Sequence, residues 1–87
     1  MSKDHESFVS EGQVIYDYNT KTGILKLNPH LFKESELEHI TKTVKNNPKN
    51  VGFGISLMPV GTKVFYGVKE VRVLTHEEMQ YEHQHKP

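Results

Sequence analysis

Histidine is the one chemically reactive residue type that this sequence uses often, with six among 87 residues. Zinc requires imidazole or carboxylate ligands that converge at about 2.0–2.2 Å from the ion. His76 and His83 would stand about 10.5 Å apart along a helix that rises ~1.5 Å per residue, which is too far for one ion. We therefore predict no functional metal site.

The C-terminal residues 82–87 contain two of these histidines, His83 and His85, which share a face in an extended tail. With Glu82 or His76 they would form at most an adventitious or intermolecular metal site. They would also gain charge as the pH falls through about 6.5, which makes a pH response a second interpretation. The simpler interpretation, which we prefer, is a solvated tail without a partner.

The carboxylates form no recognisable general acid–base pair. Such catalysis needs a shielded carboxylate or imidazole with a partner beside it, and the acidic residues lie mainly on an expected helix face or near the chain ends. Asp17 stands apart, shortly before a loop, where aspartate commonly caps its own turn. The chain has no cysteine and no recognisable serine or threonine nucleophile motif. The sequence thus predicts no catalytic residue, and we expect a protein that is not an enzyme.

The glycines of Val51-Gly52-Phe53-Gly54 are the nearest approach to a phosphate-binding loop. They lack a third glycine and the lysine-serine pair of a P-loop, and a strand is expected to continue through them. Alternating glycines in a strand more often leave room for another element that packs closely, although they can also floor a shallow ligand groove. We therefore predict no cofactor.

Tyrosines with basic neighbours are the best candidates for a binding surface. Such residues on an open sheet can stack single-stranded bases, and tyrosines equally suit protein interfaces. The turn Met58-Pro59-Val60-Gly61 adds two apolar side chains that would either insert into a partner or, for Met58, fold back onto the core. The predicted partner- or ligand-binding residues are Tyr16, Tyr18, Tyr66, Lys69, Arg72, Met58 and Val60.

These residues must be positioned by a small set of strands and one helix. Alternating apolar residues predict strands over 13–18 and 24–27, joined by a loop that Gly23 closes with a positive φ. A helix is expected next, because Ser35 and Glu38 have capping-box spacing. Leu37, Ile40 and Val44 then form one apolar stripe, and Asn46-Asn47-Pro48 ends the helix.

Two further strands are expected over residues 50–58 and 63–74. The apolar positions in the second one change phase, from the even residues Val64, Tyr66 and Val68 to the odd residues Val71 and Val73. A strict period of two cannot change phase, so we place a β-bulge between Gly67 and Lys69. Thr75 and Glu78 repeat the capping-box spacing and predict a short final helix.

The expected fold is therefore of the α+β class: a small antiparallel four-stranded sheet in ββαββ order, with one helix on one face and a short C-terminal helical turn. An extra strand around Phe8-Val9 is a variant of this fold. Residues 12–81 would form the single domain, between a flexible N-terminal segment (1–11) and the flexible histidine-containing tail (82–87).

Composition narrows the class of protein. The net charge is zero, the mean hydropathy is −0.64 and 34% of residues are hydrophobic, which favours a small folded chain over a disordered one. The absence of cysteine fits a reducing compartment, and no segment has the length of a membrane span or the pattern of a signal peptide. We expect a cytoplasmic protein, with no membrane partner, that completes its modest core as a homodimer.

One helix covers one face of such a sheet, so the other face would meet solvent or a partner. The leading hypothesis is a small non-enzymatic protein-binding module, an inhibitor or regulator that occupies a partner surface. Phage-encoded regulators share this size and lack of chemistry, which is an analogy only. The alternative is a protein that binds nucleic acid or a small anionic ligand on the tyrosine- and lysine-bearing face. Metal binding by the tail is the third hypothesis.

Overall fold

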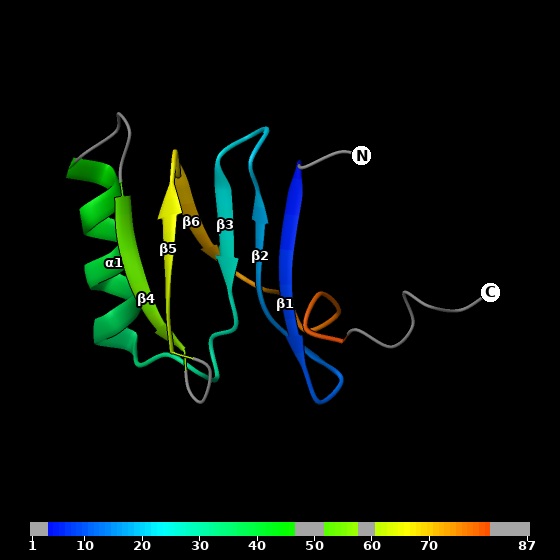
Figure 1. Cartoon of the computed structure of the whole chain (residues 1–87). Helices are drawn as coiled ribbons and strands as arrows, with labels where there is room; N and C mark the ends of the chain where they lie inside the picture. Colours follow the sequence, from blue (N-terminus) through cyan, green and yellow to red (C-terminus); the bar gives the residue numbers. More distant parts are fainter. Residues whose placement is uncertain (1–3, 47–51, 58–60, 81–87) are drawn as a thin grey trace.

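The computed structural model describes residues 4–46, 52–57 and 61–80 of the chain (Figure 1). Its elements are β1 (His5–Ser10), β2 (Gln13–Asn19), β3 (Ile24–Leu27), α1 (Glu34–Asn46), β4 (Gly52–Leu57), β5 (Gly61–Tyr66) and β6 (Glu70–Val73). The β2–β3 hairpin confirms the strands expected over 13–18 and 24–27. β1 is the additional N-terminal strand that contains Phe8 and Val9.

The strands form two sheets. Sheet A has four strands in the order β1-β2-β3-β6, and sheet B consists of β4 and β5. All pairs are antiparallel except β3 with β6, which is parallel. The expected single antiparallel sheet of ββαββ order is therefore wrong. Loops of hairpin length indicate that two consecutive strands pair with each other. The pairing of β3 with β6 instead spans the helix and sheet B, and no local sequence signal specifies it.

The segment expected as one long strand over residues 63–74 is divided at Gly67. This glycine has a φ of 76°, a left-handed conformation that residues with a side chain rarely adopt. The chain before it forms β5 in sheet B, and the chain after it forms β6 in sheet A. The phase change in the apolar pattern is thus explained by a corner between two sheets and not by the predicted bulge.

A bulge does occur, in β2. Phe8 pairs with Tyr16 and Val9 pairs with Val14, so Ile15 is an extra residue in the register. As a result, the side chain of Ile15 joins the core beside Tyr16, while Val14 packs with Val9 in a separate cluster. The bulge therefore lets one strand supply apolar residues to two sides of sheet A.

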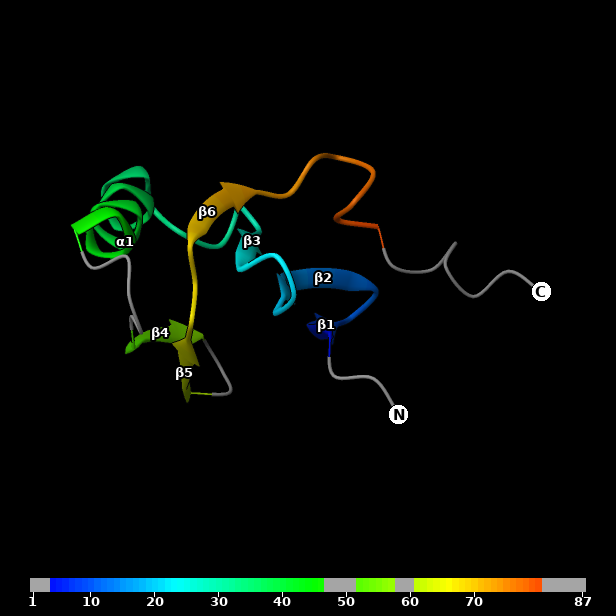
Figure 2. The ribbon, with the colours of Figure 1, turned by 90° about the horizontal axis from the view of Figure 1, so that it is seen from above.

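The main core lies between the inner face of sheet A, sheet B and α1 (Figure 2). We call inner the face of sheet A that carries Tyr16, Tyr18, Leu25 and Leu27, all at most 5% exposed. Phe65 of β5 meets this face edge-on, with its ring centre 4.9 Å from that of Tyr16 and 5.5 Å from that of Tyr18. Aromatic pairs in this geometry stabilise the packing beyond their buried area.

Helix α1 begins two residues before the position that the sequence indicated. Leu37 N donates to Lys33 O at 2.9 Å, and Glu36 Oε1 accepts from Lys33 N at 2.7 Å. Lys33 is therefore the N-cap, and Glu36 takes the reciprocal role expected of Glu38. The apolar stripe is confirmed, because Ile40 and Val44 are buried. Among the described residues, no helix is long and apolar enough to cross a bilayer.

The opposite, outer face of sheet A is covered only in part. The chain after β6 turns back over it at residues 76–79 (Figure 2), where Val14, Leu74 and Met79 form a second small cluster. Both bonds of the predicted capping box are present: Thr75 N donates to Glu78 Oε1 at 2.9 Å, and Glu78 N donates to Thr75 Oγ1 at 3.2 Å. The structure has a single turn at this position, shorter than a helix.

Candidate functional site

Two of the tyrosines predicted for a binding surface lie in the core. Tyr16 is 5% exposed and Tyr18 is 4% exposed. The Tyr16 hydroxyl donates to Glu6 Oε2 at 3.1 Å, and the Tyr18 hydroxyl donates to the Tyr66 carbonyl beside the Gly67 corner. Burial, reinforced by the nearby Glu6 carboxylate, raises the pKa of Tyr16 to about 12. These two rings stabilise the joint between the sheets and are not available for stacking.

The other predicted residues are not brought together. Tyr66 is 69% exposed on the side of sheet B that faces away from sheet A, whereas Arg72 is exposed on the outer face of sheet A. Lys69 lies at the start of β6, where its N–H donates to Gly23 O at 2.7 Å. Met58 and Val60 lie outside the described residues. Of the predicted set, Tyr66 is the large exposed apolar residue that the structure places on a sheet surface.

The surface around Tyr66 is flat and uncharged. We call it the hairpin face; it consists of Gly52, Gly54, Ser56, Thr62, Val64 and Tyr66. Tyr66 pairs with Gly52 across the hairpin, and a methyl group at Gly52 would lie 2.6 Å from Cε1 of the ring. Gly52 thus leaves space for the tyrosine to lie against the sheet. Val64, 46% exposed, adds a second apolar side chain to the same face.

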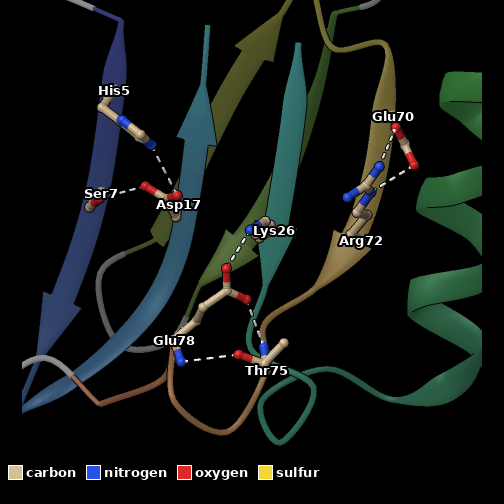
Figure 3. A network of polar contacts seen from close by, with 8 residues as sticks. All are labelled: His5, Ser7, Asp17, Lys26, Glu70, Arg72, Thr75 and Glu78. Carbon is tan, nitrogen blue, oxygen red and sulfur yellow. Dashed lines mark hydrogen bonds and ion pairs between the residues drawn. The ribbon is translucent and has the colours of Figure 1, made fainter. Parts of the chain in front are cut away.

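A second candidate surface is the outer face of sheet A, which carries a row of polar side chains across four strands (Figure 3). The register places Ser7, Asp17, Lys26 and Arg72 side by side. Lys26 pairs with Glu78, and Arg72 Nε donates to Glu70 Oε2 at 2.8 Å. These pairings hold the pKa values of Glu78 and Glu70 below the usual range. Each charge of the row therefore has a partner within the chain.

Serine, histidine and aspartate meet in this row, but in an order that does not activate the serine. Ser7 Oγ donates to Asp17 Oδ1 at 2.8 Å, and His5 Nε2 contacts Asp17 Oδ2 at 3.2 Å. In a hydrolase triad the imidazole lies between the hydroxyl and the carboxylate, so that it can take the proton. Here the carboxylate is in the middle and both flanking residues are exposed. The geometry supports an ordered polar surface.

The same contacts correct the interpretation of Asp17 as the cap of its own turn. The loop is instead capped by Asn19, whose Oδ1 accepts from Lys21 N at 3.0 Å and from Thr22 N at 3.2 Å. Sequence reasoning also missed Ser7 and Lys26 as members of this row. The signal was present in the alternation of Asp17 with Tyr16 and Tyr18, which assigns the aspartate to the face opposite the two tyrosines.

A shallow hollow of about 400 Å³ lies on the outer face beside the C-terminal turn. Its lining combines an apolar part, from Val9, Val14 and Leu74, with polar groups that include His5, Asp17 and Glu78. Among the described residues, no three histidines or carboxylates converge closely enough to hold a metal ion. The histidines of the tail, His83 and His85, lie outside the described residues.

Comparisons with protein-family models, with curated proteins and with solved structures each gave no match.

Proposed function

We propose that this chain is a small cytoplasmic protein-binding module without enzymatic activity, which contacts a protein partner through the hairpin face. The observation that carries the proposal is the exposure of Tyr66 and Val64, 69% and 46%, on a strand pair without a charged side chain on that face. A quarter of all residues in the chain are charged. An uncharged strip with an aromatic residue is the composition that distinguishes the centre of protein interfaces.

The geometry favours a protein partner over a nucleic acid. Affinity for nucleic acid depends mainly on cations that meet the phosphates, and the hairpin face supplies none. Lys63, on the opposite side of β5, already pairs with Glu6 at 2.7 Å. The rings of Tyr16 and Tyr18, which would have stacked bases, are buried. The module would act as an inhibitor or regulator by occupying part of its partner's surface.

Substitutions on the hairpin face test this proposal. Immobilised wild-type protein and Tyr66→Ala are used to capture partners from lysate of the native host, and the captured protein is then purified and titrated by calorimetry. Loss of a central interface tyrosine commonly costs about 2 kcal/mol, so we expect binding roughly 30-fold weaker with Tyr66→Ala. Val64→Lys, which places a charge beside the ring, should weaken binding as well.

Arg72→Ala is the matched control, because it changes an exposed residue on the other sheet. Its affinity should equal that of the wild type. A partner lost with Arg72→Ala but retained with Tyr66→Ala would show that the outer face of sheet A is the binding surface and would refute the proposal. Sedimentation of the wild type and of Tyr66→Ala separates a second copy of this chain from a different protein as the occupant.

A further inference from the structure

The outer edge of β4 carries none of the charges, prolines or bulges that protect many edge strands. Among the residues that the structure describes, β4 has a hydrogen-bonded neighbour, β5, on one side only. Edge strands are normally blunted by charges, prolines or bulges, because their unpaired N–H and C=O groups attract other strands. The β4 sequence, Gly-Phe-Gly-Ile-Ser-Leu, contains no charge and no proline, and its register with β5 is regular. By contrast, β1 carries His5 and Glu6.

Helix α1 runs alongside this edge, on the side of β4 away from β5 (Figures 1 and 2). One hollow lies between them, and a second lies between the end of β4 and the segment that precedes α1. The first, of about 270 Å³, is lined by Phe32, Ser35, Glu36, His39, Ile40, Gly54, Ile55 and Ser56. The second, of about 200 Å³, is lined by Ile15, Leu31, Phe32, Glu36, Ser56 and Leu57. Because Phe32, Glu36 and Ser56 line both, the two hollows are adjacent, and we call them together the α1–β4 groove.

The dimensions of the α1–β4 groove suit an extended chain. Side chains on the same face of a strand are two residues apart, about 6.6 Å at a rise of ~3.3 Å per residue. Two adjacent hollows, each lined by both apolar and polar residues, can each take one such side chain. Each hollow is smaller than the ~300–1,000 Å³ typical of small-molecule sites. Leu31, 49% exposed at the second hollow, adds apolar surface without a partner.

The charge of the helix wall indicates the chemistry of the occupant. Of the glutamates of α1, Glu36 lines the groove, whereas Glu34 and Glu38 line a different hollow on another side of the helix. Glu36, which lines both hollows, uses Oε1 to accept from Lys33 N. Its second oxygen has no hydrogen-bond partner among the described residues. A lysine or arginine of the bound segment would meet this oxygen.

We infer that the α1–β4 groove binds an extended segment of another protein, which adds to β4 as a third strand of sheet B. The segment has two apolar side chains separated by one residue, and a basic residue that faces Glu36. Main-chain hydrogen bonds to β4 supply affinity, and the two hollows supply specificity. The inference rests on the proposed function and names the form of the partner. The groove shares Gly54 and Ser56 with the hairpin face, but Tyr66 and Val64 do not line it.

The test uses a phage-displayed library of random peptides, selected on the full-length wild-type protein. We expect enriched peptides with an apolar–any–apolar core and a neighbouring lysine or arginine. Ser35→Trp places a large ring in the first hollow. The affinity for the synthetic peptides, measured by fluorescence polarisation, should fall at least tenfold. Thr41→Trp makes the same change on the same helix outside the groove, and the affinity should be unchanged. Two sets of peptides are then compared, one N-methylated at the odd backbone positions and the other at the even positions. Only one of the two sets should lose binding, because every second N–H of an added strand points toward β4.

Three results would overturn the inference: no enriched peptide, equal affinity for Ser35→Trp and the wild type, or binding that tolerates N-methylation in both phases. A dimer that Ser35→Trp dissociates, with no peptide enriched, would assign the β4 edge to a second copy of the chain and would also overturn it. Circular dichroism melting of both tryptophan variants checks that the fold is intact. Tyr66→Ala separates the two proposals. It should weaken the binding of the captured partner and should leave the affinity for the selected peptides unchanged.

Discussion

At the scale of single residues, Asn28 shows how the bulge in β2 is accommodated. It is fully buried, and its backbone N–H donates to Ile15 O at 2.9 Å. Its side-chain Nδ2 donates to Val14 O at 3.2 Å, while Oδ1 accepts from His30 N at 2.9 Å. The β2–β3 ladder ends at the pair Tyr16–Leu27, and one asparagine bonds the two β2 carbonyls just beyond it. Its role is therefore structural, at the point where sheet A ends and the chain leaves for α1.

Replacement of Asn28 by alanine should lower the free energy of unfolding by about 2–3 kcal/mol. The substitution removes a partner from Val14 O in a buried site and from His30 N in a partly buried one, and an unsatisfied buried group costs roughly 1–3 kcal/mol. Urea denaturation measures the loss. Asn19→Ala is the matched control, because that side chain also bonds two backbone groups, the N–H groups of Lys21 and Thr22, but lies where water can replace it. Equal losses for the two variants would contradict the role assigned to burial.

At the scale of elements, Gly67 directs one stretch of chain into two sheets. We predict that Gly67→Ala lowers the free energy of unfolding by about 1–2 kcal/mol, because alanine disfavours the left-handed conformation. The nearest atom to an added Cβ, the Tyr18 hydroxyl at 3.5 Å, is at ordinary contact distance. Backbone conformation and not crowding is thus the expected cause. Thermal denaturation followed by circular dichroism measures the change.

Gly12 supplies the control for this prediction. Its φ of 79° is close to the 76° of Gly67, and no atom lies within 4 Å of an added Cβ. Gly12→Ala should therefore cost a similar amount, and Gly67→Asn should cost less than Gly67→Ala, since asparagine tolerates this conformation. A loss with Gly67→Asn as large as that with Gly67→Ala would indicate crowding at the corner instead.

The elements also show what the sequence could and could not predict. The β2–β3 hairpin, the apolar stripe of α1 and the Thr75–Glu78 capping box depend on residues close in the chain, and all three are confirmed. The assignment of β5 and β6 to different sheets depends on contacts distant in the chain. The apolar positions in residues 63–74 do change phase. A β-bulge and a corner between two sheets, however, produce the same sequence pattern, so the pattern could not distinguish them.

The predicted binding surface failed for a related reason. Alternation correctly placed Tyr16 and Tyr18 on one face, but it cannot tell which face a second sheet will cover. Sheet B covers the tyrosine face, and the side chains of Asp17 and Lys26 remain on the other. Tyr66, which the sequence grouped with the other two tyrosines, is exposed, because the corner at Gly67 turns β5 so that its even positions point outward. The α1–β4 groove requires the relative placement of two elements and has no sequence signature.

At the scale of the whole molecule, Glu6 joins the two sheets at their open side. Its carboxylate lies 2.7 Å from Lys63 Nζ of β5 and accepts from the Tyr16 hydroxyl of β2. The bond with Lys63 is the main cause that holds the pKa of Glu6 below its ordinary value of 4.5. Because the groups are 44% and 39% exposed, the pair contributes at most about 1 kcal/mol. The pair matters because of its position: in the described part of the chain, it connects two sheets that share no backbone hydrogen bonds of a strand ladder.

The titration of Glu6 and Tyr16 predicts loss of stability at both ends of the pH range. A lowered folded-state pKa means that the contribution of Glu6 is present above about 4.5 and disappears as the pH falls through the folded-state pKa. A raised pKa means that the contribution of Tyr16 is complete below about 10 and is lost as the pH rises toward about 12. Urea midpoints measured across pH should therefore decline on both limbs.

Single substitutions assign each limb. Glu6→Gln should lower stability near neutral pH by about 0.5–1 kcal/mol and should match the wild type in acid, because the ion pair is then absent from both. Tyr16→Phe should remove the last phenolate step from an absorbance titration and flatten the alkaline limb. Glu77→Gln, at an exposed carboxylate in the C-terminal turn, is the control and should follow the wild type throughout. An acid limb that persists unchanged in Glu6→Gln would mean that other carboxylates, such as Glu78 with its bond to Lys26, hold the fold at low pH.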